Sequence, residues 1–197
     1  MKVVSLDLSN STGYAILVDG SLAGHGVVKS TSPAEVFRCH DYSYIERAKS
    51  VSALCKELIL KEKPDMIAIE QTNKSKSRFT QKQLEFIHYA VLEDLREFKD
   101  SVVYIDTGAW RRGLGIVSTK EDAKHNALVK KKLARGKLTS KHRAVRWANE
   151  TYNLSLKLKD DDIADAIAIA VFAYKRHSKV ETVNAIESID IFFNKEE

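Results

Sequence analysis

The chain has 197 residues, of which 44% are hydrophobic and 30% are charged. This composition fits one globular domain with a sizeable core and excludes a chain that is disordered throughout. The net charge of +5 is a modest basic excess, which permits a polyanionic partner without requiring one. The two cysteines, Cys39 and Cys55, have neither zinc-ligand spacing nor a disulfide-dense pattern, so a reducing cytoplasm fits best.

The first thirty residues predict an antiparallel meander of three strands. MKVVSLDLS is typical of a strand rather than a signal peptide, and strands are expected over 3–8, 14–18 and 21–28. The turn SNSTG joins the first two strands. Asp19-Gly20, a strong hairpin signal, joins the second and third.

The rest of the chain predicts helices alternating with two further strands. Apolar residues at helical spacing indicate helices over 41–61 and 81–98, followed by the strands MIAIE and VVYID. Two basic helices, near 120–135 and 140–152, precede a last helix that starts at KDDDIADAIAIA. Its apolar run, 166–174, is too short to span a bilayer. Handedness rules place the fourth strand parallel to the first and beside it, which predicts an α/β fold on a mixed five-stranded sheet.

Four aspartates stand at the head of that last helix, and capping does not explain all of them. Asp160 and Asp161 can accept bonds from the N–H groups of the first turn, but Asp165 lies about a turn further in. Asp162 and Asp165 are three residues apart and so share a helix face. Carboxylates held that close repel unless a cation lies between them. This stretch alone leaves two readings open, a metal or acid/base site and a solvated helix start.

Two acidic residues from distant segments favour the first reading. In the predicted sheet, Asp7 on the first strand and Glu70 at the end of the fourth can be neighbours. Each has a local alternative, since Asp7 could end a strand in a turn and Glu70 could be a rim charge. Their conjunction with Asp162 and Asp165 indicates one site built from three segments.

SLDLSNSTGYAI, IAIEQ and DDIADAIAIA, in this order and at these spacings, resemble the RuvC-type Holliday junction resolvases of the RNase H-like superfamily. The likeness runs from Met1 to about His177. It implies an RNase H-like nuclease domain over 1–179, with helices on both faces of the sheet and a basic helical insertion at about 107–152. A C-terminal tail of unknown role, 180–197, would follow. The long insertion is more typical of phage or viral relatives, which would place the protein in a host cytoplasm.

The resemblance also implies a metal site. In the family, four acidic residues bind two divalent metals, and the matching positions here are Asp7, Glu70, Asp162 and Asp165. Asp161 is the alternative third ligand. Magnesium is a hard cation that prefers oxygen ligands, so two Mg²⁺ ions suit four carboxylates, and Mn²⁺ could substitute. The family has a basic residue near the metals, and Lys120 resembles it.

The implied activity is structure-selective endonuclease cleavage of four-way (Holliday) DNA junctions by metal-dependent phosphodiester hydrolysis. Lysine and arginine contact phosphates without reading sequence, and 71–83 and 123–149 contain no acidic residue. A solvated helix face is the alternative for these stretches. Phe79 could stack on a base or anchor a helix in the core. The residues expected to contact DNA are Lys74, Lys76, Arg78, Arg111, Arg112, Lys130, Lys131, Lys132 and Arg135.

Other functions remain as alternatives. A general branched-DNA or flap nuclease of the same fold stays open, because metal ligands do not encode substrate shape. An actin-like ATPase also begins with a strand like SLDLSNSTG, but this chain is short for two such domains and its 8 glycines supply no second phosphate loop. A non-catalytic nucleic-acid-binding module would not need four converging carboxylates.

A four-way junction has a two-fold axis that relates two equivalent scissile strands. A symmetric homodimer would supply one site to each of them. The predicted helix over 81–98 carries Phe86, Tyr89 and Ala90 off its main core stripe, and its counterpart forms the interface in the family. We therefore expect a homodimer through this helix, and burial of the three residues within the monomer is the alternative.

Overall fold

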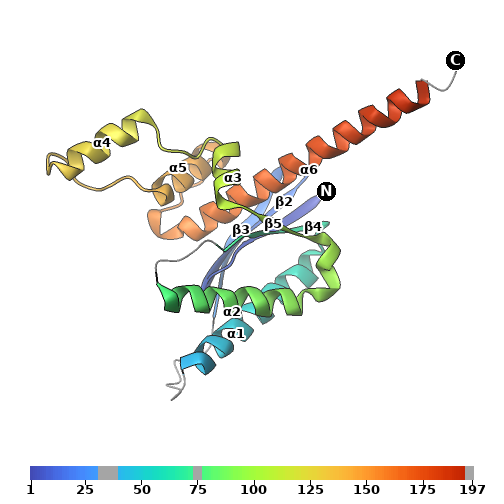
Figure 1. Ribbon diagram of the computed structural model, residues 1–197, viewed down its shortest axis with the longest axis horizontal. Helices are drawn as coiled ribbons and strands as arrows, with labels where there is room; N and C mark the ends of the chain where they lie inside the picture. Colours follow the sequence, from blue (N-terminus) through green and yellow to red (C-terminus); the bar gives the residue numbers. More distant parts are fainter. Residues whose placement is uncertain (31–39, 73–76, 194–197) are drawn as a thin grey trace.

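The computed structural model describes residues 1–30, 40–72 and 77–193, of which 40 and 179–193 are described as backbone only. Figure 1 shows a twisted sheet between two layers of helices. The sheet has five strands, in the order β3-β2-β1-β4-β5. The predicted α/β class is therefore confirmed, as are the number of strands and the helices on both faces.

The first three strands form the predicted meander. β1 (Lys2–Asp7), β2 (Ser11–Val18) and β3 (Ser21–Lys29) pair in antiparallel fashion. The hairpin between β2 and β3 turns at Asp19 and Gly20, whose φ angles of 49° and 81° suit a type I′ turn. β2 starts earlier than predicted, at Ser11, because its ladder with β3 continues as far as the pair of Ser11 with Lys29.

The last two strands are parallel to β1. β4 (Met66–Glu70) pairs with β1, and β5 (Val102–Ile105) pairs with β4 at the edge of the sheet. Side chains alternate between the two faces of each strand. Val3 and Leu17 therefore enter the core on one side of the sheet, and Val4 and Ile16 enter the core on the other.

Two helices cover the second of these faces. α1 (His40–Glu62) packs against α2 (Arg78–Asp94), as Figure 1 shows below the sheet. α1 buries Ala48, Val51, Cys55 and Ile59, which recur at the spacing of one helix face. α2 ends at Asp94, short of the predicted residue 98, and the 3₁₀ helix η1 (Arg96–Ser101) connects it to β5.

The predicted insertion forms three helices, α3 (Thr107–Gly113), α4 (Lys120–Lys130) and α5 (Ser140–Tyr152). α3 and α5 pack on α6, the last helix (Asp161–Phe193), while α4 extends away from the body of the molecule in Figure 1. α4 ends five residues before the predicted limit, because Lys132 adopts the left-handed φ of 61°, which no helix continues.

α6 crosses the other face of the sheet and contacts β1, β2, β3 and β4. The 3₁₀ helix η2 (Leu158–Asp160) precedes it. The buried segment 164–170 consists largely of alanine and isoleucine, and the alanines let the helix lie close to the strands. The helix continues to Phe193, through most of the segment expected to be a separate tail. No helix in the described ranges combines the length and the apolar character needed to cross a bilayer.

Candidate active site

Asp7 and Glu70 lie side by side at one end of the sheet. Each is the last residue of its strand, and β1 and β4 are parallel neighbours with Leu6 opposite Ile69. The two strands therefore end on the same side of the sheet, at its carboxyl end. The two carboxyl groups are close enough for the charge of Glu70 to raise the pKa of Asp7.

Gly13 allows the start of α6 to lie at the same end of the sheet, beside Asp7. It is the partner of Asp7 across the β1–β2 ladder, and a Cβ atom at this position would lie 1.9 Å from the carbonyl oxygen of Asp162. Since no side chain fits there, the first turn of α6 lies directly on β2. The Ser5 hydroxyl fixes the next turn, because it donates to the carbonyl oxygen of Ala166 at 2.6 Å. The acidic head of α6 is thus placed beside β1.

Asp7 is within electrostatic range of the other three acidic residues. Burial raises the pKa of Asp7 well above its usual value, and the negative charges of Glu70, Asp165 and Asp162 raise it further. Nearby like charges disfavour ionisation of a carboxyl group. The structure thus brings together all four acidic residues expected from the sequence.

Asp165 is the most buried member of the group on α6, with 7% of its surface exposed. Burial raises its pKa to about 7. The Arg111 guanidinium opposes this shift, and the charges of Glu70 and Asp161 add to it. Its Oδ2 atom accepts a hydrogen bond from Arg111 at 3.2 Å. Within the described ranges its other oxygen, Oδ1, is buried and has no hydrogen-bond partner.

The two candidates for the third acidic position have different surroundings. Asp162 is half-buried, and its pKa is raised by burial and by the charge of Asp161, against the lowering effect of Lys141. Asp161 is buried and forms an ion pair with Lys141 of α5. The charge of Asp162 raises the pKa of Asp7, whereas the charge of Asp161 raises the pKa of Asp165. The carboxylate of Asp161 therefore already has a partner in the protein.

α3 adds two side chains that the sequence reasoning did not place in the site. The indole Nε1 of Trp110, a fully buried residue, donates to Glu70 Oε1 at 3.0 Å. The Arg111 guanidinium lies 4.7 Å from the centre of the Trp110 ring and pairs with Asp165. Arg111 was expected on the DNA surface. A buried tryptophan normally satisfies its N–H, but its partner depends on how α3 docks, which no local pattern reports.

Lys120, predicted as the basic residue of the site, is the exposed first residue of α4. Among the described residues, the ion pairs to the acidic group come from Arg111 and Lys141, and Lys120 forms none. Lys141 also belongs to the basic stretch expected to face DNA. The signal for its role is weak, because it depends on the start of α5 lying beside the start of α6.

The donor set suits a hard divalent cation. All four side chains are carboxylates, Asp165 Oδ1 lacks a partner, and the mutual repulsion is unfavourable without positive charge. In the part of the chain that the structure describes, however, no three Asp, Glu, His or Cys side chains are arranged around one metal position. One oxygen each of Glu70 and Asp165 is taken by Trp110 and Arg111. The chemistry of these residues nevertheless fits a divalent metal.

The expected DNA-contacting residues fall into distinct places. Arg78 is exposed at the start of α2, Arg112 is exposed on α3, and Lys74 and Lys76 lie outside the described residues. The remaining residues are exposed at the end of α4 and in the loop after it, namely Lys130, Lys131, Lys132 and Arg135. These four residues, called the basic tip of α4 below, lie at the end of the helix that extends away from the body in Figure 1 and in the loop that follows it.

Other cations of the basic stretch have a structural partner. Asp122 is 2% exposed and pairs with Arg143 at 3.6 Å and with Arg146 at 3.3 Å. Asp122 also forms a capping box with Thr119 at the start of α4. This cluster joins α4 to α5, so the acid-free stretch serves in part to hold the insertion together.

Phe79 and the proposed dimer residues differ in exposure. Phe79 is 70% exposed in the first turn of α2, so the alternative of a core anchor is wrong. Tyr89 is also 70% exposed, whereas Phe86 and Ala90 pack partly against the core. All three dimer residues line a groove of about 340 Å³ between α1 and α2.

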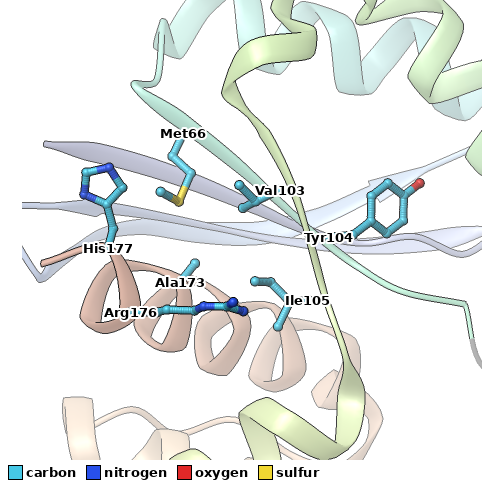
Figure 2. A pocket seen from close by; sticks show the side chains of 7 residues that line it. All are labelled: Met66, Val103, Tyr104, Ile105, Ala173, Arg176 and His177. Carbon is cyan, nitrogen blue, oxygen red and sulfur yellow. The ribbon is translucent and has the colours of Figure 1, made fainter. Parts of the chain in front are cut away.

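A second hollow, of about 390 Å³, lies between β5 and the later turns of α6 (Figure 2). Its lining includes Met66 at the start of β4, opposite Arg176 and His177 of α6. Glu70 is at the other end of β4. None of the four acidic residues lines this hollow, although Ile105, which does, pairs with Glu70 across the ladder.

No protein-family model matches this sequence, and no curated protein matches it significantly. Solved structures do. Thermus thermophilus RuvC superposes with a TM-score of 0.61 at 20% sequence identity, covering 90% of this chain and 97% of that chain. T. thermophilus RuvC in complex with a Holliday junction substrate gives the same TM-score at 18% identity, with 87% and 91% covered. The chain therefore has the RNase H-like fold of RuvC.

Proposed function

We propose that this protein is a metal-dependent endonuclease that resolves four-way DNA junctions. The observation that carries the proposal is the convergence of Asp7, Glu70, Asp162 and Asp165 at one edge of a RuvC fold. Carboxylates contributed by two adjacent strands and one helix start are costly to keep together. A pair of divalent cations would offset that cost and give the site its chemistry.

The four carboxylates would hold two Mg²⁺ ions. Bound there, the ions supply an activated water, neutralise charge on the scissile phosphate and stabilise the departing 3′ oxygen. Asp7 would be the central residue of this set, since the charges of Glu70 on β4 and of Asp165 and Asp162 on α6 all raise its pKa. Asp162 is favoured over Asp161 as the third ligand because the charge of Asp162 raises the pKa of Asp7, whereas Asp161 is not among the groups that do so.

The basic tip of α4 is proposed to contact the phosphates of a junction arm. Four exposed cations there, Lys130, Lys131, Lys132 and Arg135, face solvent. Arg78 and Phe79, exposed in the first turn of α2, follow the segment that leaves β4 directly after Glu70. We place them near the scissile phosphate, where Phe79 can stack on an unpaired base.

The working unit is proposed to be a homodimer. The two scissile strands of a junction are related by a two-fold axis, and one site reaches one strand. Tyr89, exposed beside the groove between α1 and α2, offers an apolar surface that a second copy can cover.

The test is a panel of synthetic substrates with Mg²⁺: a four-way junction, a flap, a linear duplex and an RNA–DNA hybrid. We expect paired, symmetric incisions in the junction and at least about tenfold slower cleavage of the others. Equal cleavage of flap and junction would replace the resolvase with a general branched-DNA nuclease of the same fold. Absence of cleavage on all four substrates would remove the nuclease assignment.

A further inference from the structure

α3 is a seven-residue helix attached to the edge of the carboxylate site. The carboxylate of Asp106 accepts a bond from the Ala109 amide at 2.7 Å and so caps the helix. Trp110 is fully buried, and Gly113 lies so close to Phe172 of α6 that a Cβ atom would be 2.5 Å from its ring. The backbone of α3 is therefore fixed against α6. This helix carries two consecutive residues, Trp110 and Arg111, that contact the carboxylate site.

The two consecutive residues contact different carboxylates of the site. Trp110 holds Glu70 through the indole N–H, at 3.0 Å. Arg111 holds Asp165 at 3.2 Å and lies over the indole ring that its neighbour presents. Glu70 and Asp165 come from different elements, β4 and α6, so α3 sets the relative position of two of the four carboxylates.

The two contacts differ in how easily they can be given up. Trp110 is enclosed in the core, and an indole is neutral, so its bond to Glu70 is compatible with a cation on the other carboxylate oxygen. The Arg111 side chain is 26% exposed and carries a charge. A guanidinium 3.2 Å from Asp165 Oδ2 and a divalent cation on the same carboxylate would repel strongly in this buried site.

The pair of Arg111 and Asp165 also leaves some of its hydrogen-bonding atoms without partners. Within the described residues, Asp165 Oδ1 and Arg111 Nε are both buried and without hydrogen-bond partners. Buried polar atoms are normally paired, and an exception calls for a reason such as an unseen ion. An arginine that fully matched this aspartate would engage both oxygens in a bidentate pair. The contact has a single bond and leaves one carboxylate oxygen for another ligand.

We propose that Trp110 and Arg111 are positioning residues of the carboxylate site, and that Arg111 is displaced from Asp165 when a divalent cation binds. Trp110 keeps Glu70 in place in both states. Arg111 supplies the positive charge that holds Asp165 in the metal-free state, and it competes with the metal for that carboxylate. This inference rests on the proposed function, since it assigns roles around the same metal site.

The first measurement is calorimetric titration with Mn²⁺, in the absence of DNA, of the wild type, R111Q, R111K and R112Q. Removing a competing charge should make R111Q bind Mn²⁺ at least about fivefold more tightly, the lower end of a typical coupling between two sites. R111K keeps the charge and should bind within about threefold of the wild type. R112Q, which loses an exposed charge on the same helix, should also remain close to it.

The second measurement follows the guanidinium directly. The Nε–Hε NMR resonance of Arg111, assigned by its absence from R111K, should shift on titration with Mg²⁺, with the same midpoint as cation binding. The Arg112 resonance should not shift. A merely structural arginine would leave both the resonance and the affinity ranking unchanged.

The failures can be told apart. If R111Q binds Mn²⁺ no more tightly than the wild type, or if the Arg111 resonance is unmoved at saturating Mg²⁺, the displacement is wrong and the metal site stands. If the wild type binds no divalent cation at all, the metal site is wrong and both proposals fall. Melting temperatures of R111Q, R111K and R112Q in EDTA close to that of the wild type would establish that the variants fold.

Discussion

At the scale of single residues, the carboxyl group of Asp165 makes the metal-free protein sensitive to pH. Burial, opposed by Arg111 and reinforced by Glu70 and Asp161, raises its pKa to about 7, against an ordinary value near 3.9 in an unfolded chain. The folded state therefore binds the proton more tightly than the unfolded state. The contribution of this group to stability is fully present below about pH 4 and is lost as the pH rises through about 7.

The first prediction follows from that sign. In EDTA, the contribution of Asp165 to the free energy of unfolding should fall between about pH 4 and pH 7, by at most about 4 kcal/mol. Urea unfolding at a series of pH values measures the total, and the same series on D165N supplies the reference. The difference between the two curves should carry this dependence. A difference that does not change with pH, or that grows with it, would contradict the raised pKa.

The second prediction concerns Gly13, where β2 meets the first turn of α6. In G13A the new Cβ atom would lie 1.9 Å from the Asp162 carbonyl oxygen, so the helix must move away from the strand. Overpacking of this kind costs about 1–3 kcal/mol or more. We expect lower stability in urea and weaker Mn²⁺ binding. G24A is the matched control, since its Cβ would meet only the tip of Ile16, at 3.3 Å. Equal effects of the two changes would reject the role of Gly13.

The four acidic residues could be expected from sequence because their positions follow from regular elements. A strand end, a second strand end and a three-residue spacing in a helix each fix where Asp7, Glu70 and Asp165 point. Trp110 and Lys141 could not be found in this way. Their contacts, to Glu70 and Asp161, depend on how separate helices pack on α6. No periodicity within α3 or α5 records that packing.

At the scale of elements, the insertion of α3, α4 and α5 is where the predicted boundaries were least accurate. α5 was expected at its observed limits, and the structure adds Thr139 as its N-terminal cap. α4 was expected to run to about residue 135, and the sequence from 130 to 135 contains no proline or glycine. A left-handed Lys132 ends it instead. Lysine has no particular preference for that conformation, so local propensity gives no warning.

The third prediction tests the basic tip of α4. In the variant K130A/K131A/K132N, asparagine replaces Lys132 because it tolerates the left-handed φ of 61°. Loss of these charges should weaken junction binding and reduce the slope of log affinity against log salt by up to about 3, roughly one for each phosphate contact. Fluorescence anisotropy at several salt concentrations measures the slope. K99A, with an exposed lysine on η1, is the control. An unchanged slope in the triple variant would make the tip a solvated face.

The fourth prediction concerns the ion cluster that joins α4 to α5. D122N removes the carboxylate that Arg143 and Arg146 share, and so leaves a partly buried arginine without a partner. Because Arg146 is half exposed, we expect a loss of only about 1–3 kcal/mol. Hydrogen exchange should accelerate in α4 and the start of α5 and not in the strands of the sheet. Equal acceleration throughout would mean that the insertion and the sheet unfold as one unit.

At the scale of the whole molecule, the order of strands and helices determines where the acidic residues lie. The meander, the parallel β4 and the crossing α6 bring three distant segments to one edge of the sheet, and that topology could be predicted from turn signals and crossover handedness. The length of α6 could not, since its apolar run ends near Tyr174 while the helix continues to Phe193. Packing against the sheet explains only the buried turns of this helix and does not explain its continuation beyond Tyr174.

The fifth prediction is the oligomeric state. If the exposed Tyr89 lies in a two-fold interface, Y89E should convert a dimer into a monomer, as measured by light scattering during gel filtration. The monomer should nick a cruciform plasmid once and seldom linearise it. Y42E is the control, since Tyr42 is 60% exposed near the start of α1. A wild type that is monomeric at working concentrations and yields mainly nicked circles would reject the dimer.

The most direct test of the central claim compares the wild type with D7N on a synthetic four-way junction, with cleavage and binding measured on the same samples in Mg²⁺. Asp7 is the carboxylate on which the other three converge. Its neutralisation should lower the cleavage rate by at least about 10²-fold, an effect of the size seen when a major transition-state contact is removed, and leave junction affinity equal or higher. Cleavage by D7N at the rate of the wild type, or loss of binding in proportion to loss of cleavage, would contradict the four-carboxylate site.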